Sequence, residues 1–135
     1  MYRDINANLD ANESIRPAVM TADTDGQGVD LRGADSAIVV VTVGAITGAA
    51  GDATVTLEES DDNSTFTDVA DADILGTEPT LAANTAYQFG YRGTSRYVRA
   101  TFTVGGETNV AASAMVVRGN LARATTEAPR SNVPA

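Results

Sequence analysis

The feature that most constrains this chain is a period-two alternation of apolar and polar residues in several short segments. In Ala53–Glu58 (ATVTLE), Val55 and Leu57 fall on one side, while the Thr and Glu residues fall on the other. Tyr87–Arg92 and Tyr97–Val104 repeat the same pattern. Successive side chains of a β-strand point to opposite faces, so the pattern predicts strands with one buried face.

A continuous apolar run interrupts this alternation between Ile38 and Val43 (IVVVTV). Such a β-branched run is typical of a central strand that is covered on both sides. Even when extended to Ala37–Ile46, the run is too short and too β-branched for a membrane-spanning helix. The first residues lack the apolar stretch of a secretory signal, so we expect a protein that stays where it is made or enters an assembly there.

Further strands are expected where short apolar segments lie between turn signals. These segments are Arg16–Thr21, Val29–Arg32, Thr65–Val69 and Ala112–Arg118. A single helical turn is expected near Asp71–Leu75. Many short strands at close spacing, without an amphipathic helix, predict an all-β fold: an antiparallel β-sandwich that is jelly-roll-like.

The length of 135 residues fits one domain with a polar segment at each end. We expect a flexible N-terminal arm over 1–14, a β-sandwich domain over 15–121 and an extended C-terminal tail over 122–135.

The chain contains neither cysteine nor histidine. Disulfides, thiolate metal sites and Ser-His-Asp or Cys-His catalysis are therefore excluded. The most frequent general base and the most frequent nitrogen ligand for metals are absent as well.

Charge is distributed unevenly along the sequence. Residues 1–80 hold sixteen acids and three Arg, whereas residues 81–135 hold two Glu and six Arg. The formal net charge of −9 argues against nucleic-acid binding, which needs a basic footprint. Two interpretations of the segregation remain open: separate surfaces for different partners, or mixing of the two sets when the chain folds.

Two acidic turns partly resemble calcium loops. Asp61, Asn63 and Thr65 alternate as ligands would, but Phe66 and Ala72 occupy the positions of the required Gly and the closing acid. In the other turn Asp23, Asp25 and Gln27 are followed by Gly28, but Ala34 occupies the closing position. We therefore expect solvated turns and no metal or other cofactor.

The segment Glu59–Val69 (ESDDNSTFTDV) is predicted to be a hairpin turn and its returning strand. Its Asp and Asn side chains can hydrogen-bond the local backbone, and Phe66 is expected to anchor the strand in the core. Glu58 and Glu59 should lie on opposite faces of one strand, so they cannot act as a catalytic acid–base pair. No catalytic residue is expected, and we expect no enzyme.

Arg92, Arg96 and Arg99 cluster on or beside one predicted hairpin. They could bind a phosphate or a carboxylate, but pairing with the surplus acids of the chain is the favoured interpretation.

Four phrases together resemble small β-rich proteins encoded among the head and structural genes of tailed bacteriophages and gene transfer agents. They are VDLRGADSAIVVVTVGAI, ESDDNSTFTDVADADILGT, YRGTSRYVRATFTVGG and AMVVRGN, within residues 28–120. The resemblance implies a virion component, foremost a capsid decoration (cement) protein on the outside of the major capsid lattice. It also implies a homo-oligomer, with a trimer favoured, and arms that reach neighbouring subunits; no membrane or nucleic-acid partner is expected, and the contact residues stay unknown.

Two alternatives remain open. The first is another virion role, in the neck, the tail or a head fibre. The second comes from SDDNSTFTDV and SRYVRATFT, which are similar to phrases in discoidin-type carbohydrate-binding jelly rolls. The absence of Trp departs from that family, whose members grip ligands with exposed aromatics.

Overall fold

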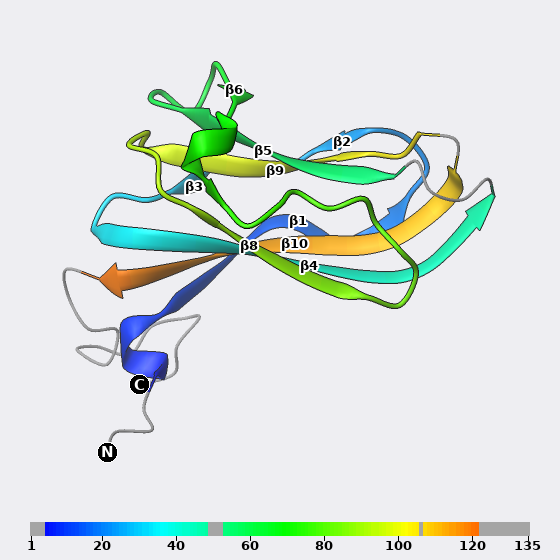
Figure 1. Cartoon of the computed structure of the whole chain (residues 1–135), viewed down its shortest axis with the longest axis horizontal. Coiled ribbons are helices and arrows are strands. Elements are labelled where there is room, and N and C mark those ends of the chain that lie inside the picture. Colours follow the sequence, from blue (N-terminus) through cyan, green and yellow to red (C-terminus); the bar gives the residue numbers. More distant parts are fainter. Residues whose placement is uncertain (1–4, 49–52, 106, 122–135) are drawn as a thin grey trace.

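The computed structural model describes residues 5–48, 53–105 and 107–121, which form two antiparallel sheets stacked as a β-sandwich (Figure 1). Sheet A has the strand order β1-β10-β4-β8-β7. Its strands are β1 (Asp10–Met20), β10 (Glu107–Leu121), β4 (Ala34–Gly48), β8 (Ala86–Tyr91) and β7 (Ile74–Leu75).

Sheet B has the order β2-β9-β5-β6, and β3 also pairs with β9. Its strands are β2 (Thr24–Asp25), β9 (Tyr97–Thr103), β5 (Thr54–Ser60), β6 (Thr67–Asp68) and β3 (Val29–Asp30). If β2 and β3 are taken as one interrupted strand and β7 as a short addition, the chain passes between the sheets in the order of a jelly roll. The predicted fold class is confirmed.

The core lies between the sheets and is mainly aliphatic. Alternate residues of each long strand point into it, and they include Val39, Val41, Val55, Leu57, Val98 and Val116, all at most 1% exposed. Phe89, Tyr91 and Phe102 complete it. The period-two pattern thus becomes the inner face of each sheet.

The strand boundaries differ from the predicted ones at both ends of the sheets. β1 begins at Asp10, inside the expected arm 1–14, because Asp10–Glu13 pair with Met115–Arg118 of β10. β2 lies in a segment expected to be a turn. The expected tail, 122–135, lies outside the described residues.

The predicted hairpin is confirmed, since β5 and β6 pair around the turn Asp61–Phe66. Asp62 closes this turn: its Oδ1 accepts the N–H groups of Ser64 and Thr65, both at 2.9 Å, and the Ser60 hydroxyl. A Cβ at Gly28 would collide with the Asn63 side chain, so Gly28 lets the turn lie close to the chain before β3. The predicted helical turn is present as η2 (Asp71–Asp73).

The expected role of Phe66 as a core anchor is wrong. Phe66 is only half-buried and lies under the Arg99 guanidinium, whose Cζ is 4.1 Å from the ring centroid. Val69, at 6% exposed, takes the core position instead, and its N–H donates to the Leu57 carbonyl.

Candidate interaction surface

The outer face of sheet A is apolar at its centre and is covered by no other described part of the chain. We call this surface the open face and define it by the outward residues of β4 and β10: Ile38, Val40, Thr42, Gly44, Ala111, Ser113, Met115 and Val117. None of these residues is buried, and Ile38 is 37% exposed. Their chain neighbours Val39, Val41, Ala114 and Val116 are completely buried on the inner face.

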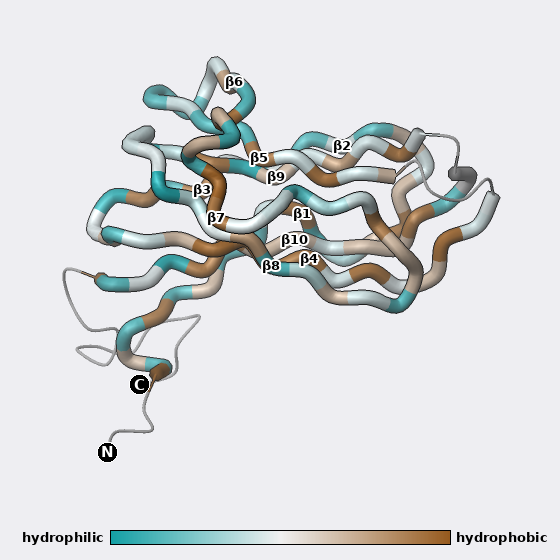
Figure 2. The backbone as a smooth tube through the Cα atoms, viewed as in Figure 1, coloured by the Kyte–Doolittle hydropathy of each residue, from teal (hydrophilic) through white to brown (hydrophobic). Residues whose placement is uncertain are grey.

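The register of β4 and β10 brings these outward residues together. Ile38 lies opposite Val117, Val40 opposite Met115, and Thr42 opposite Ser113. The two strands therefore present a contiguous apolar strip. Figure 2 shows hydrophobic colouring along β4 and β10, whereas the β6 region is mainly hydrophilic.

The prediction that Ile38–Val43 is covered on both sides is wrong for the chain alone. β4 is central in sheet A, but sheet B covers only one of its faces. When two sheets stack, only the inner face of each sheet is buried. A strand with apolar residues on both faces, such as β4, therefore leaves its outer apolar residues uncovered. The sequence did not lead us to expect Val40 and Met115 at the surface. The available signal was the unbroken apolar runs IVVV and AMVV, which place apolar residues on both faces of a strand.

No residue that defines the open face carries a charge, in a chain where 20% of the residues are charged. Charges are present on β1 at the rim, where Glu13 is opposite Met115 and forms an exposed ion pair of 3.3 Å with Arg16. The outer side of sheet B differs, because Glu58, Arg99 and Asp25 form an ionic cluster there.

A shallow groove of about 380 Å³ runs along the open face beside β1. Its walls come from Pro17–Val19 on β1, and its floor comes from small residues that include Gly44 and Ala111. Val19 is 59% exposed at this rim. The groove could receive apolar side chains of a partner.

The edges of the sheets discourage strand addition, so contact through a face is favoured. β2, β6 and β7 each have two residues. The long edge strand β1 contains Pro17 and two register shifts between Glu13 and Ala18. Short edges, proline and bulges are the usual protection of sheet edges against pairing with other chains.

The acidic turns that resemble calcium loops have structural roles. The Asp62 carboxylate accepts hydrogen bonds from the backbone N–H groups of its own turn. These hydrogen bonds, first the one from Thr65 and then the one from Ser64, lower the pKa of the carboxyl group. Asp25 pairs with Arg99, and Asp23 Oδ1 accepts the Val104 N–H at 2.9 Å. Within the described residues, no group of three acids is placed to hold a metal ion.

The two adjacent glutamates point to opposite sides of β5, as expected. Glu58 Oε1 accepts from Arg99 Nε at 2.7 Å on the outer side. Glu59 Oε1 accepts from the Tyr91 hydroxyl at 2.7 Å on the inner side. The two carboxylates thus have separate structural partners.

The favoured interpretation of the Arg cluster is confirmed for two of its three members. Arg96 pairs with Asp30 at 2.9 Å, and Arg99 pairs with Glu58 and Asp25. Arg92 Nε donates instead to the Ala72 carbonyl at 2.9 Å. Arginines from residues 81–135 therefore pair with acids from residues 1–80. Folding thus mixes the two sets of charge that are segregated in the sequence.

Comparison with known proteins identifies one family. The family model Bbp16 matches residues 17–117, which run from β1 through both sheets into β10. No curated protein and no solved structure matches the chain. Among the described residues, no helix has the length and apolar character needed to cross a membrane.

Proposed function

The chain belongs to the Bbp16 family, a phage-related family whose membership indicates a phage structural protein, and from this premise we propose that it is a capsid decoration (cement) protein. In this proposal it binds the outer surface of the major capsid lattice and stabilises the head. The proposed location of the protein is the capsid surface of the virion.

The observation that supports this function best is the open face. Val40 and Met115 keep an apolar strip in water, which costs about 25 cal/mol per Å² until a partner covers it. Contiguous exposed apolar surface of this kind marks interaction sites. A lattice of capsid subunits would supply a repeated partner for the strip.

The size of the face suits a protein that binds in many copies. The two neighbouring strands of the open face, with about eight residues each, present roughly 250 Å² of sheet surface. A standard stable interface buries about 800 Å² per partner, so one open face would bind weakly by itself. Oligomerisation, with a trimer favoured, and arms that reach neighbouring subunits would add avidity to each contact.

The acidic part of the molecule supports an orientation on the shell. Residues 58–78 contain eight Asp and Glu residues and no Arg. They span the end of β5, β6, η2 and β7, of which β5 and β6 belong to sheet B. With the open face against the shell, the exposed carboxylates of this segment would face solvent and discourage unwanted association. They are those of Asp61, Asp62, Asp68 and Asp71.

Quantitative mass spectrometry of purified particles tests the proposed position. A decoration protein should be present in copies comparable to the major capsid protein. A far smaller number would favour the alternative of a neck, tail or fibre component. Absence from purified particles would refute every virion role, and saturable binding on a glycan array would then support the carbohydrate-binding alternative.

A binding assay tests the open face directly. Shells lacking the protein are mixed with the wild type or with Ile38→Asp or Val40→Asp, and bound protein is measured by co-sedimentation. Both variants should bind at least tenfold more weakly, because a charge would be buried without a partner. Thr103→Asp, an exposed position on β9 of sheet B, is the matched control and should bind like the wild type.

A further inference from the structure

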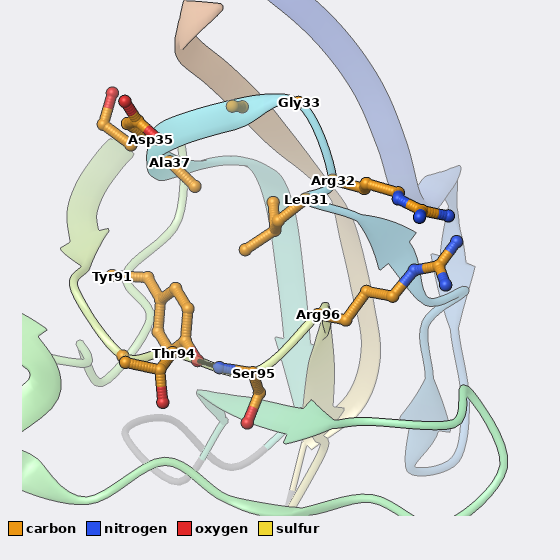
Figure 3. Close-up of a pocket in the computed structure, with 12 residues that line it drawn as sticks. Leu31, Arg32, Gly33, Asp35, Ala37, Tyr91, Thr94, Ser95 and Arg96 are labelled. Carbon is orange, nitrogen blue, oxygen red and sulfur yellow. Dashed lines mark hydrogen bonds between the residues drawn. The ribbon is translucent and has the colours of Figure 1, made fainter. Parts of the chain in front are cut away.

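Two hollows of the same volume, about 380 Å³ each, differ in their lining. The hollow at the start of β4 is lined mainly by polar groups, and the Arg32 guanidinium points away from it, beside that of Arg96 (Figure 3). The groove on the open face, in contrast, has no charged residue in its lining. The groove is therefore the hollow that suits an apolar group of a partner.

The groove arises from residues that lie side by side across three strands. Val19 of β1 lies opposite Ala111 of β10. A Cβ atom added to Gly44 of β4 would lie 3.4 Å from the Ala111 Cβ, so these two residues are neighbours as well. Side-chain size thus falls from Val to Ala to Gly across the sheet. The Val19 side chain forms a wall above a floor that has almost no side chains.

Irregular strand pairing surrounds the groove. Ala111 lies opposite two residues of β4, Gly44 and Ala45, because the register shifts between Val110 and Ala112. The strand that supplies the wall, β1, carries two further register shifts. Bulges of this kind bend a strand and redirect its side chains, and they are frequent next to functional sites.

The fold of the chain itself does not require glycine at position 44. The φ angle of Gly44 is not positive, so other residues can adopt its backbone conformation. An added Cβ would meet its nearest neighbours, both atoms of Ala111, at 3.4 and 3.6 Å, which are ordinary contact distances. Glycine inside a strand weakens the strand, and it often marks a place where a ligand or another chain approaches closely. The missing side chain therefore points to a partner.

We propose that the groove receives one bulky apolar side chain, of the leucine or phenylalanine type, from a subunit of the shell. Gly44 and Ala111 determine this specificity by keeping the floor open. The inserted side chain would lie against Val19 and Pro17, which removes apolar surface of both partners from water. A charged side chain would lose its hydration in the uncharged groove without gaining a partner. This inference rests on the proposed function, because the shell supplies the side chain.

Filling the floor of the groove should weaken binding even though it adds apolar surface. In co-sedimentation with shells lacking the protein, Gly44→Ala should raise Kd several-fold. Gly44→Val should raise Kd roughly tenfold, because its side chain occupies the place of the inserted one. A flat apolar contact would give the opposite result, with equal or tighter binding. Thr103→Val, at an exposed position of sheet B, is the control and should bind like the wild type.

A second variant opens the groove instead of filling it. Val19 is 59% exposed, so Val19→Ala removes the wall without disturbing the core. This variant should also raise Kd several-fold, and unchanged binding would overturn the inference. Urea unfolding of each variant shows whether a loss of binding comes from a loss of fold.

The outcomes separate this inference from the proposed function. If the wild type does not bind shells, the decoration role fails. If Ile38→Asp weakens binding while Gly44→Val binds like the wild type, the decoration role and the open face stand, and the groove is not used. Sedimentation velocity of the protein without shells tests a second copy as the occupant. Self-association that is lost in Gly44→Val would overturn the shell as the source of the side chain.

A titration without shells tests the ligand chemistry. Isotope-labelled protein is titrated with N-acetyl-leucinamide and with N-acetyl-glutaminamide, which is similar in size but polar. The amide signals of Val19, Gly44 and Ala111 are followed by NMR. We expect the leucine probe to shift these signals at lower concentration than the glutamine probe. Equal responses to the two probes, or no response to either, would overturn the proposal.

Discussion

Arg118 on β10 and Asp10 at the start of β1 form an ion pair with Nη2 and Oδ2 3.1 Å apart. Arg118 Nη1 also donates to the carbonyls of Asp30 at 2.9 Å and Arg32 at 3.1 Å. One side chain thus joins the first long strand, the last strand and the turn that leads into β4. Both partners of the ion pair are largely buried, at 18% and 11% side-chain exposure, so water cannot replace the contact easily.

Arg118→Ala should destabilise the fold by about 3 kcal/mol, because the largely buried Asp10 carboxylate would lose this ion pair. Urea unfolding followed by circular dichroism measures this loss. Arg16→Ala is the control, since its ion pair with Glu13 is exposed, and it should change stability by less than about 0.5 kcal/mol. Equal effects of the two substitutions would show that the Arg118 contacts add little.

Tyr91→Phe should cost about 1–2 kcal/mol, because the Glu59 carboxylate and the Ser95 N–H both lose a partner. Burial, with the hydrogen bond to Glu59, raises the pKa of the Tyr91 hydroxyl from 10.0 to about 12. Between pH 10 and about 12 the Tyr91 hydroxyl is therefore protonated in the folded state and ionised in the unfolded state. The stability that this group contributes is complete below pH 10 and is lost as the pH rises toward 12.

Unfolding measured at several alkaline pH values checks this prediction. The wild type should lose stability between pH 10 and 12 more steeply than Tyr91→Phe, which lacks the ionising group. Parallel curves for the two proteins would contradict the raised pKa.

Glu78→Gln should leave stability unchanged or raise it at neutral pH. Burial raises the pKa of Glu78, although its Oε1 accepts the Leu57 N–H at 2.9 Å. Because the folded pKa is above the unfolded value, the contribution of this group is most favourable at low pH and is lost as the pH rises through the folded pKa. Gln keeps the acceptor and removes the ionisation.

Glu78→Ala is the matched comparison, because it removes the acceptor as well. It should lose about 1–3 kcal/mol through the unsatisfied Leu57 N–H. Thermal unfolding at pH 7 and at a pH below the ordinary Glu pKa separates the two effects. A loss of stability in Glu78→Gln at neutral pH would show that the charge itself stabilises the fold.

Asp62→Ala should loosen the turn between β5 and β6, because three hydrogen bonds to its Oδ1 disappear. Amide exchange of Ser64 and Thr65 should become faster, while exchange in β9 stays slow. The lowered pKa of Asp62 means that its contribution is present above the unfolded pKa and is lost as the pH falls through the folded one. Asp61→Ala, an exposed neighbour, is the control and should leave both amides unchanged.

The strands with a clear alternation could be predicted from sequence because their signal is local. Tyr97–Thr103 and Thr54–Ser60 alternate clearly, and both are strands near the predicted positions. The start of β1 at Asp10 could not be predicted, because its partner Arg118 lies near the other end of the chain. β2 was not predicted for a similar reason. Its two residues, Thr24 and Asp25, form a strand because they pair with the distant β9.

The candidate surfaces were less accessible to sequence reasoning than the strands. Phe66 shows why: an aromatic residue in a returning strand suggests a core position, but Arg99 from another strand stacks on it. The pairing of arginines with acids had no sequence signal, because it depends on which strands become neighbours.

The sequence by itself determined the all-β class, the sandwich and the chemical character of β4, because alternation and β-branched runs act within one strand. Only the tertiary structure decided which side of Ile38–Val43 is covered. Two stacked sheets share a single core, so each sheet buries one face and leaves the other to solvent or to a partner. The apolar run therefore supplies both the core through Val39 and Val41 and the open face through Ile38 and Val40.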